Sequence, residues 1–454
     1  MNRTPSSRSL ALDVLVDLER RDAYSDVLLN TVLDRQPRMS ARDRALTSHL
    51  VYGVLRWRNR LDHHLARFCR QPLQKLHPKV LQILRLGAYQ ILFLDRIPDR
   101  AAVAEAVDLT RHAGVAQASG LVNAVLRRVA ECGAELPDQL SAEQRLSLLF
   151  GCPGWLVERW ITEYGADGAE SLCRGAARVP QLWLRTDPRR TSRDAALARL
   201  AQAGIDAFPG AFAPEAIGLS GGDPRANPLV AEGLAVVQDQ ASQLISHWLA
   251  PTPGWRVLDG CAAPGMKTAH LAGLAGDNGS VEALEIHPHR AEQMRQLAGR
   301  HGLTNLNVHC TDARMFRAEK PYDAVLVDAP CSGLGVLHRT PEAKWRRRPE
   351  DLDELPELQA AILDNLAAAV RPGGVLVYAT CTTLHAENEA VMETFLAAHP
   401  EFRTEPPASG PVDWQPFLGA DGFLRTYPAG LEGSGSMAVD GFFSARLRRV
   451  EDPS

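Results

Sequence analysis

The 454-residue sequence predicts a multidomain protein with an all-α N-terminal bundle, a small α+β subdomain and a C-terminal α/β domain. Three observations predict this order. Apolar residues recur at three- and four-residue spacing through residues 1–145, as in amphipathic helices. Short strand and helix patterns mix in residues 150–235. Apolar strand-like runs then alternate with helical patterns through residues 236–450, which predicts a doubly wound parallel sheet.

The N-terminal third reads as one amphipathic helix after another. The clearest of these segments begin at Leu10, Val80, Ala101 and Ser119. Residues 1–145 carry 22 Lys and Arg against 16 Asp and Glu, whereas the remainder carries 28 against 38. A basic domain on an acidic chain is typical of contact with a polyanion. Charge alone leaves nucleic-acid binding and an ordinary solvated helix surface equally open.

The most basic stretch of this third, from Tyr52 to Arg70, interleaves arginines with aromatic residues. Arginine and aromatic groups together can hold a phosphate backbone and stack bases. We therefore predict RNA contacts at Arg56, Arg58 and Arg60. The aromatic residues, Trp57 and Phe68, fit a packed core better.

After Phe150 the sequence pattern changes from successive amphipathic helices to a mixture of short helix and strand segments. The run from Cys152 predicts a short helix, and QLWLRTDP, residues 181–188, predicts a strand. A second helix follows, with Ser192 as its N-cap and Gly204 at its C-terminal end. We interpret residues 150–235 as a small subdomain that leads into the catalytic domain.

The C-terminal segment alternates strands and helices. The predicted strands are WRVLDG, SVEALEI, NLNVHCTDA, YDAVLVDAP, GGVLVYATC and DGFFSARLRR. Two of the predicted helices begin at Lys267 and at Pro288, and a third spans residues 354–370. This order favours a parallel sheet with an antiparallel edge.

Two cysteines stand directly beyond two of these strands. Cys331 follows YDAVLVDAP, and Cys381 follows GGVLVYAT. Ligands and catalytic groups gather at the carboxyl ends of parallel strands, so we expect both thiols in one crevice. A thiolate is a strong nucleophile at neutral pH. A cysteine in a sheet is more often a small buried apolar residue, but that interpretation suits Cys310 better than this pair.

A loop of small residues after the first strand of this domain predicts a nucleotide-like cofactor. The candidate loop residues are Cys261, Ala262, Ala263, Pro264, Gly265, Met266 and Lys267. Small residues between a strand and a helix allow backbone amides to approach such a ligand. Glu285, at the end of the next strand, is placed to bind ribose hydroxyls, and Asp312 to meet an adenine amino group. Asp259 and Asp328 complete a row of acids at four strand ends.

These motifs resemble the NOL1/NOP2/Sun family of RNA cytosine-5 methyltransferases. The matching segments are CAAPGMKT, DAPCSG, HRTPEAKW, YATC and DGFF. The helical third resembles a NusB-like RNA-binding domain, including NAVLR. The resemblance implies a Rossmann-like class I methyltransferase fold behind this bundle. It also implies that residues 261–267, Glu285, Asp312 and Asp328 bind S-adenosyl-L-methionine.

The resemblance further implies covalent catalysis on a cytosine of small-subunit (16S) ribosomal RNA. Cys381 is then the nucleophile that adds to carbon 6 of the base, and Cys331 helps to release the product. Asp328 would hydrogen-bond the ring nitrogen and the exocyclic amine. In the basic segment downstream of Cys331, the residues expected to contact RNA are His338, Arg339 and Lys344.

Three positions depart from the usual family pattern. Met266 stands where a second glycine is usual, Glu285 where an aspartate is usual, and Thr382 where a serine follows the nucleophile. Met266 would cost roughly 1–2 kcal/mol if its backbone needed a positive φ. None of the three changes removes a catalytic group.

Other functions remain open at this stage. The same chemistry could act on transfer RNA, or the chain could be a non-catalytic RNA-binding factor in ribosome assembly. A cysteine hydrolase would need a histidine base, and the nearest in sequence are His338 and His385. Scattered cysteines and the lack of an apolar leader predict a cytoplasmic protein without a metal or membrane partner. We expect a monomer that binds bare ribosomal RNA.

Overall fold

The computed structural model describes residues 5–21, 23–408, 410–428 and 439–451, and the chain forms two compact units. The first unit joins Met1–Arg178 to a short downstream segment, Leu337–Arg346. The second unit joins Val179–Val336 to Arg347–Ser454. In this division the helix that follows Pro153 belongs to the first unit.

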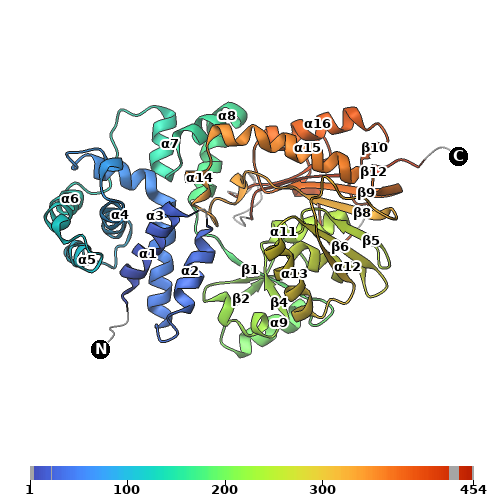
Figure 1. Ribbon diagram of the computed structural model, residues 1–454, viewed down its shortest axis with the longest axis horizontal. Helices are drawn as coiled ribbons and strands as arrows, with labels where there is room; N and C mark the ends of the chain where they lie inside the picture. The colour runs from blue at the N-terminus through green and yellow to red at the C-terminus, as the bar shows by residue number, and fades with distance from the viewer. Residues whose placement is uncertain (1–4, 22, 409, 429–438, 452–454) are drawn as a thin grey trace. The chain divides into compact units, whose positions relative to one another are not determined.

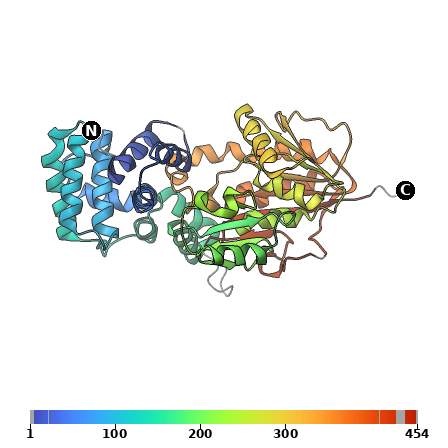
Figure 2. The ribbon, with the colours of Figure 1, turned by 90° about the horizontal axis from the view of Figure 1, so that it is seen from below.

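The first unit is a helical bundle, and Figure 2 shows several of its helices, in blue to cyan, running side by side. Its helices are α1 (Ser7–Arg20), α2 (Ser25–Asp34), α3 (Ala41–Ala66), α4 (Pro78–Phe93), α5 (Asp99–His112), α6 (Ser119–Cys132), α7 (Ala142–Phe150), α8 (Gly154–Ala177) and α14 (Ala343–Arg346). The predicted short helix after Pro153 is confirmed as the first part of α8, which breaks at Gly165 (φ +71°, ψ 179°) and resumes as a second helical stretch to Ala177. Trp57 and Phe68 pack against the bundle core, as predicted. Nowhere in the described chain is a helix long and apolar enough to cross a membrane.

A small antiparallel sheet begins the second unit. Its strands are β1 (Leu182–Thr186), β2 (Ala207–Pro209), β3 (Ala216–Leu219) and β4 (Ala235–Val237), in the order β2-β3-β1-β4. Helices α9 (Arg193–Gln202) and α10 (Pro228–Ala231) connect them. The Ser192 hydroxyl accepts a hydrogen bond from the Ala195 amide, and Gly204 has a φ of +69°, so both predicted ends of α9 are confirmed.

The larger sheet carries the parallel core that the sequence predicts. Its order among the described residues is β10-β12-β9-β8-β5-β6-β7, with β11 paired to β12. The strands are β5 (Arg256–Asp259), β6 (Ser280–Glu285), β7 (Leu306–Cys310), β8 (Tyr322–Asp328), β9 (Val370–Thr380), β10 (Phe402–Thr404), β11 (Leu424–Thr426) and β12 (Phe442–Arg449). Strands β5 to β9 are parallel, whereas β12 runs antiparallel to β9. The sheet is Rossmann-like with an antiparallel edge.

Helices cover both faces of this sheet (Figure 1). On one face lie α11 (Gln240–Leu249), α12 (Met266–Ala275) and α13 (Pro288–His301), and on the other α15 (Glu354–Ala367) and α16 (Glu389–Ala398). Successive strand residues point to opposite faces, so Val257 packs with the first group and Leu258 with the second. Because both faces are buried, the strands read as continuous apolar runs, and their polar residues gather at the carboxyl ends.

Candidate functional site

The structure brings the two predicted cysteines together. Strands β8 and β9 are parallel neighbours, with Asp328 opposite Ala379, so the loops that follow them leave the sheet side by side. The Sγ atoms of Cys331 and Cys381 lie 3.3 Å apart. The Cys381 amide also donates to the Cys331 sulfur at 3.3 Å. The juxtaposition expected from the strand-end rule is therefore present.

Buried polar groups hold the two cysteine loops in place. The hydroxyls of Ser332 and Thr382, one residue beyond each cysteine, lie 2.6 Å apart. The fully buried Glu387 carboxylate accepts hydrogen bonds from the Ser332 amide and the Gln359 side chain, both at 2.9 Å. Sequence reasoning missed Glu387 and Gln359, because no local pattern distinguishes them from ordinary helix residues. These contacts fix the loop that carries Cys331.

The cysteine pair is electrostatically unequal. The hydrogen bond with Cys381, together with burial, raises the pKa of the Cys331 thiol well above its usual range. The neutral thiol is therefore the favoured form of Cys331, and either sulfur can be the donor in the hydrogen bond between the two.

Lys267 and Asp328 form an ion pair beside the cysteines. Their Nζ and Oδ2 atoms lie 2.7 Å apart, and the side chains are 14% and 23% exposed. The Lys267 ammonium also lies 4.8 Å from the centre of the Phe442 ring. Burial lowers the pKa of Lys267, but Asp328 raises it more, so the net shift is upward. The Lys267 ammonium therefore stays charged and holds the Asp328 side chain at the end of β8.

The other acids occupy the strand ends in the predicted order. Burial raises the pKa of Asp259 to about 7, and its Oδ2 atom accepts a hydrogen bond from Thr268 at 2.7 Å. Its Oδ1 atom is buried without a partner. Glu285, at the end of β6, accepts the His287 amide at 2.7 Å. Asp312 lies just beyond β7, and its pKa is lowered by the Arg314 guanidinium that binds both of its oxygens. The acids thus line one edge of the sheet next to the small-residue loop.

The small-residue loop leads directly into helix α12, at the position expected for a nucleotide-like cofactor. Gly265 has a φ of +99° and directly precedes the helix, and a Cβ atom there would lie 3.2 Å from Met294 Cγ. Met266 is the first helical residue and has no positive φ, so the strain expected for a methionine there is absent. Its side chain packs against the core instead. The unpartnered Asp259 oxygen and the open helix N-terminus both fit a polar ligand.

Gly265→Ala is expected to destabilise the protein by about 1–2 kcal/mol, because it puts a Cβ on a left-handed backbone and presses it on Met294. Gly299→Ala is the matched control, since the space around Gly299 in α13 is open. There alanine should stabilise the helix by about 0.5–1 kcal/mol. Urea unfolding should show a lower free energy of unfolding for Gly265→Ala than for the parent protein, and a higher one for Gly299→Ala. Equal effects would contradict this description of the loop.

The predicted RNA-contact residues divide into buried and partly exposed side chains. Arg56, His338 and Lys344 are buried. Lys344 Nζ donates to the Arg56 carbonyl at 2.8 Å, and an Arg56 guanidinium nitrogen donates to the His338 carbonyl at 3.1 Å. This arrangement does not support direct RNA contact by these three residues. They hold Leu337–Arg346 inside the helical unit, a role that local sequence does not reveal.

The remaining three candidates, Arg58, Arg60 and Arg339, are partly exposed. Arg58 lies 3.8 Å from Glu19 and 5.5 Å from the centre of the Trp345 ring. Arg60 donates to the Ala134 carbonyl at 2.9 Å. Part of the basic surface predicted from the sequence is therefore used within the unit.

Lys344→Met is expected to remove a pH dependence of stability. Burial lowers the pKa of Lys344 from 10.5 to about 8 in the folded protein. Between these values the unfolded chain holds a proton that the folded chain has released, so the free energy of unfolding rises with pH, by up to about 3 kcal/mol. Urea unfolding across this interval should show the rise in the parent protein and a flatter profile in the variant. The same slope in both proteins would contradict the burial of a titrating ammonium.

Three family descriptions match the chain. Residues 246–448 match the family described as 16S rRNA methyltransferase RsmB/F. Residues 5–131 match the NusB family, and residues 152–224 match the ferredoxin-like domain of RsmF/B-like methyltransferases. The NusB match agrees with the helical third, and the ferredoxin-like match covers α8 and the small sheet as far as β3.

Curated relatives align along nearly the whole chain. A probable ribosomal RNA small subunit methyltransferase B of Bacillus subtilis is 37% identical, covering 98% of this chain and 99% of its own length. The ribosomal RNA small subunit methyltransferase B of Pseudomonas putida is 37% identical over 83% of this chain and 86% of its own. The crystal structure of PH0851 superposes with a TM-score of 0.82 at 24% identity, covering 99% of this chain and 100% of that one, and so shares the fold.

Proposed function

The chain belongs to the ribosomal RNA small subunit methyltransferase B family, and from this premise we propose that it methylates carbon 5 of a cytosine in 16S ribosomal RNA. The methyl donor is S-adenosyl-L-methionine, which supplies an electrophilic methyl group when bound. The observation that carries the cytosine-5 assignment is the Cys331–Cys381 pair, 3.3 Å apart at two adjoining strand ends. A single nucleophile would not need a second thiol in contact with it.

Cytosine-5 chemistry explains why this site holds a nucleophile. Carbon 5 of cytosine is too electron-poor to take up a methyl group unaided. The Cys381 thiolate forms a bond to carbon 6, and the electron pair displaced from the 5,6 double bond makes carbon 5 nucleophilic. Asp328, held by Lys267 at 2.7 Å, is the group that would hydrogen-bond the protonated ring of the adduct. The residue thus stabilises charge that develops during the reaction.

Cys331 acts after Cys381 has formed its bond to carbon 6 of the base. Before the reaction, the hydrogen bond to Cys381 keeps the pKa of Cys331 high. Bonding to carbon 6 makes the Cys381 sulfur a neutral thioether, so this influence is lost and Cys331 can release its proton to solvent. Once carbon 5 carries the transferred methyl group, the Cys331 thiolate takes the remaining proton from carbon 5, the 5,6 double bond reforms, and the Cys381 thiolate leaves carbon 6. One thiol attacks and the other resolves the adduct.

The loop of residues 261–267, Glu285 and Asp312 would hold the methyl donor. The unpartnered Asp259 oxygen and the N-terminus of α12, which no side chain caps, support this placement. Arg58, Arg60 and Arg339 remain our candidates for RNA contact, because their side chains are partly exposed. A base must leave its stack to reach thiols at a sheet edge, which favours bare RNA over a folded helix as substrate. We expect a cytoplasmic monomer.

The test is transfer of labelled methyl groups from S-adenosyl-L-methionine to bare 16S RNA, to assembled small subunits and to transfer RNA. Label at carbon 5 of cytosine in bare 16S RNA is expected. Label in transfer RNA alone would mean that the protein carries out the same chemistry on transfer RNA and not on 16S RNA. Calorimetry without any measurable heat of S-adenosyl-L-methionine binding would instead support a non-catalytic assembly factor.

A further inference from the structure

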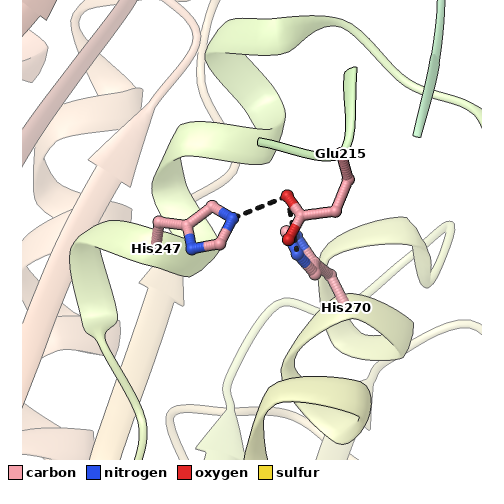
Figure 3. A group of neighbouring side chains, drawn as sticks. All are labelled: Glu215, His247 and His270. Carbon is pink, nitrogen blue, oxygen red and sulfur yellow. Dashed lines mark hydrogen bonds and ion pairs between the residues drawn. The ribbon is translucent and has the colours of Figure 1, made fainter. Parts of the chain in front are cut away.

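A second cluster of chemically capable side chains lies within the second unit, away from the cysteines in sequence and on separate elements. Glu215 directly precedes β3, His247 is in the last turn of α11, and His270 is in the middle of α12. All three are buried, and His270 is only 1% exposed. Figure 3 shows His247 directed at the Glu215 carboxylate, with His270 on its other side.

The distances bring all three side chains to one point. His247 Nε2 lies 2.8 Å from Glu215 Oε2, and His270 Nε2 lies 3.8 Å from the same oxygen. One ligand atom from each residue can be chosen so that all lie within 4.8 Å of one another. The two imidazole rings are 4.9 Å apart and nearly perpendicular. Each residue comes from a different segment, so a shared ligand would tie the small sheet to two helices of the larger domain.

His270 is the independent sign that something is bound here. Both of its ring nitrogens are buried without a hydrogen-bond partner. A neutral imidazole carries one donor and one acceptor, and leaving them unpaired in the interior costs stability. The His247–Glu215 contact satisfies those two side chains and leaves His270 unexplained.

The geometry points to Glu215, His247 and His270 as the ligands of a zinc ion that joins the small sheet to helices α11 and α12. Two imidazoles and one carboxylate form a common protein ligand set for Zn²⁺, with water in the fourth position. Ligand atoms around a tetrahedral zinc lie about 3.4 Å apart, so ligand atoms that are up to 4.8 Å apart must approach by at most about 1.4 Å when zinc binds.

Arg185 determines which metal ions the cluster can accept. Its buried guanidinium donates to the Gln238 side chain at 2.6 Å and to the Met266 carbonyl at 3.3 Å, and it acts electrostatically on both His270 and Glu215. A nearby cation opposes every dication, so affinity must come from coordination by imidazole. Imidazole favours Zn²⁺ and its neighbours among transition metals over Mg²⁺ or Ca²⁺. The sequence predicts no metal, because the three ligands are too widely spaced to form a motif.

The test uses full-length protein that is stripped with a chelator and titrated with Co²⁺ and then Zn²⁺. We expect one Co²⁺ per chain, with visible d–d bands of a tetrahedral N/O site and no thiolate-to-cobalt charge transfer. Zn²⁺ should displace it and raise the melting temperature. His247→Gln should weaken binding at least tenfold, since glutamine lacks the imidazole but can still hydrogen-bond Glu215. Glu215→Gln should do the same.

Two controls keep the proposal falsifiable. His309 forms an exposed pair with Glu282 at 3.3 Å in the same unit, so His309→Gln should leave the stoichiometry and the spectrum unchanged. The cysteine pair is the competing site, and Cys331→Ser tests it. Charge-transfer bands that disappear in Cys331→Ser would overturn the proposal. So would unchanged binding in His247→Gln, or the absence of any bound metal in the parent protein.

Discussion

Replacing Cys381 by alanine is expected to abolish methyl transfer to 16S RNA, with a loss on the order of 10⁴-fold or more, because the variant lacks the thiol that we propose adds to carbon 6. The variant should still fold, since Cys381 is only partly buried and alanine fits its space. It should also form no covalent complex with RNA. Methyl transfer and denaturing gel electrophoresis measure the two properties on the same samples.

Replacing Cys331 by alanine is expected to give the opposite covalent phenotype. Cys381 can still attack, but the proton on carbon 5 has no acceptor, so an RNA–protein adduct should accumulate while turnover stops. Cys310→Ala is the matched control, because Cys310 is exposed at the end of β7 and outside the pair, and this variant should turn over normally. An adduct that forms in Cys381→Ala and not in Cys331→Ala would reverse the two roles.

Breaking the Lys267–Asp328 pair is expected to have the second largest effect. Removing one partner of a buried ion pair leaves an uncompensated charge and costs about 3–5 kcal/mol, reduced here by the partial exposure of both groups. Lys267→Met and Asp328→Asn should each destabilise the protein, and each should lower methyl transfer, since the adduct loses its held carboxylate. The double variant should be more stable than the sum of the two single effects predicts.

The exposed pair of Arg199 and Glu232 is the control for this cycle. Both of its side chains are nearly half exposed, and exposed pairs contribute at most about 1 kcal/mol. Urea unfolding of the two sets of variants should therefore show strong coupling between Lys267 and Asp328 and weak coupling between Arg199 and Glu232. Additive effects at Lys267 and Asp328 would mean that the ammonium does not hold the carboxylate.

The sequence predicts those parts of the fold that depend on local pattern. The strands of the parallel sheet and both ends of α9 are encoded within a few residues, by apolar runs and by a serine and a glycine. The short helix predicted after Pro153 ends at the break at Gly165, and the prediction does not include the second part of α8, which runs on to Ala177. The assignment of Leu337–Arg346 to the helical unit could not be predicted, since it depends on contacts such as Glu342 with Ser25.

The candidate site also contains features that the local sequence predicts and features that it does not. The approach of Cys331 and Cys381 follows from their position beyond two neighbouring strands, because parallel strands end at the same edge of a sheet. Glu387 supports the same loop from a distant turn, and nothing in its own neighbourhood distinguishes it. Arg56 and Lys344 were assigned to RNA because charge suggests a surface, whereas their hydrogen bonds to backbone carbonyls allow them to be buried.

The segment Leu337–Arg346 limits how this protein can be divided or recombined. The chain crosses between its two units three times, at residues 178, 336 and 346. A fragment that begins at Val179 would therefore carry Glu342 without the helix N-terminus that it caps, and Lys344 without its carbonyl partner. The second unit therefore cannot be transferred to another protein on its own without losing these contacts. Any exchange of the helical unit, by evolution or by design, must supply the same few backbone partners to the segment that follows Cys331.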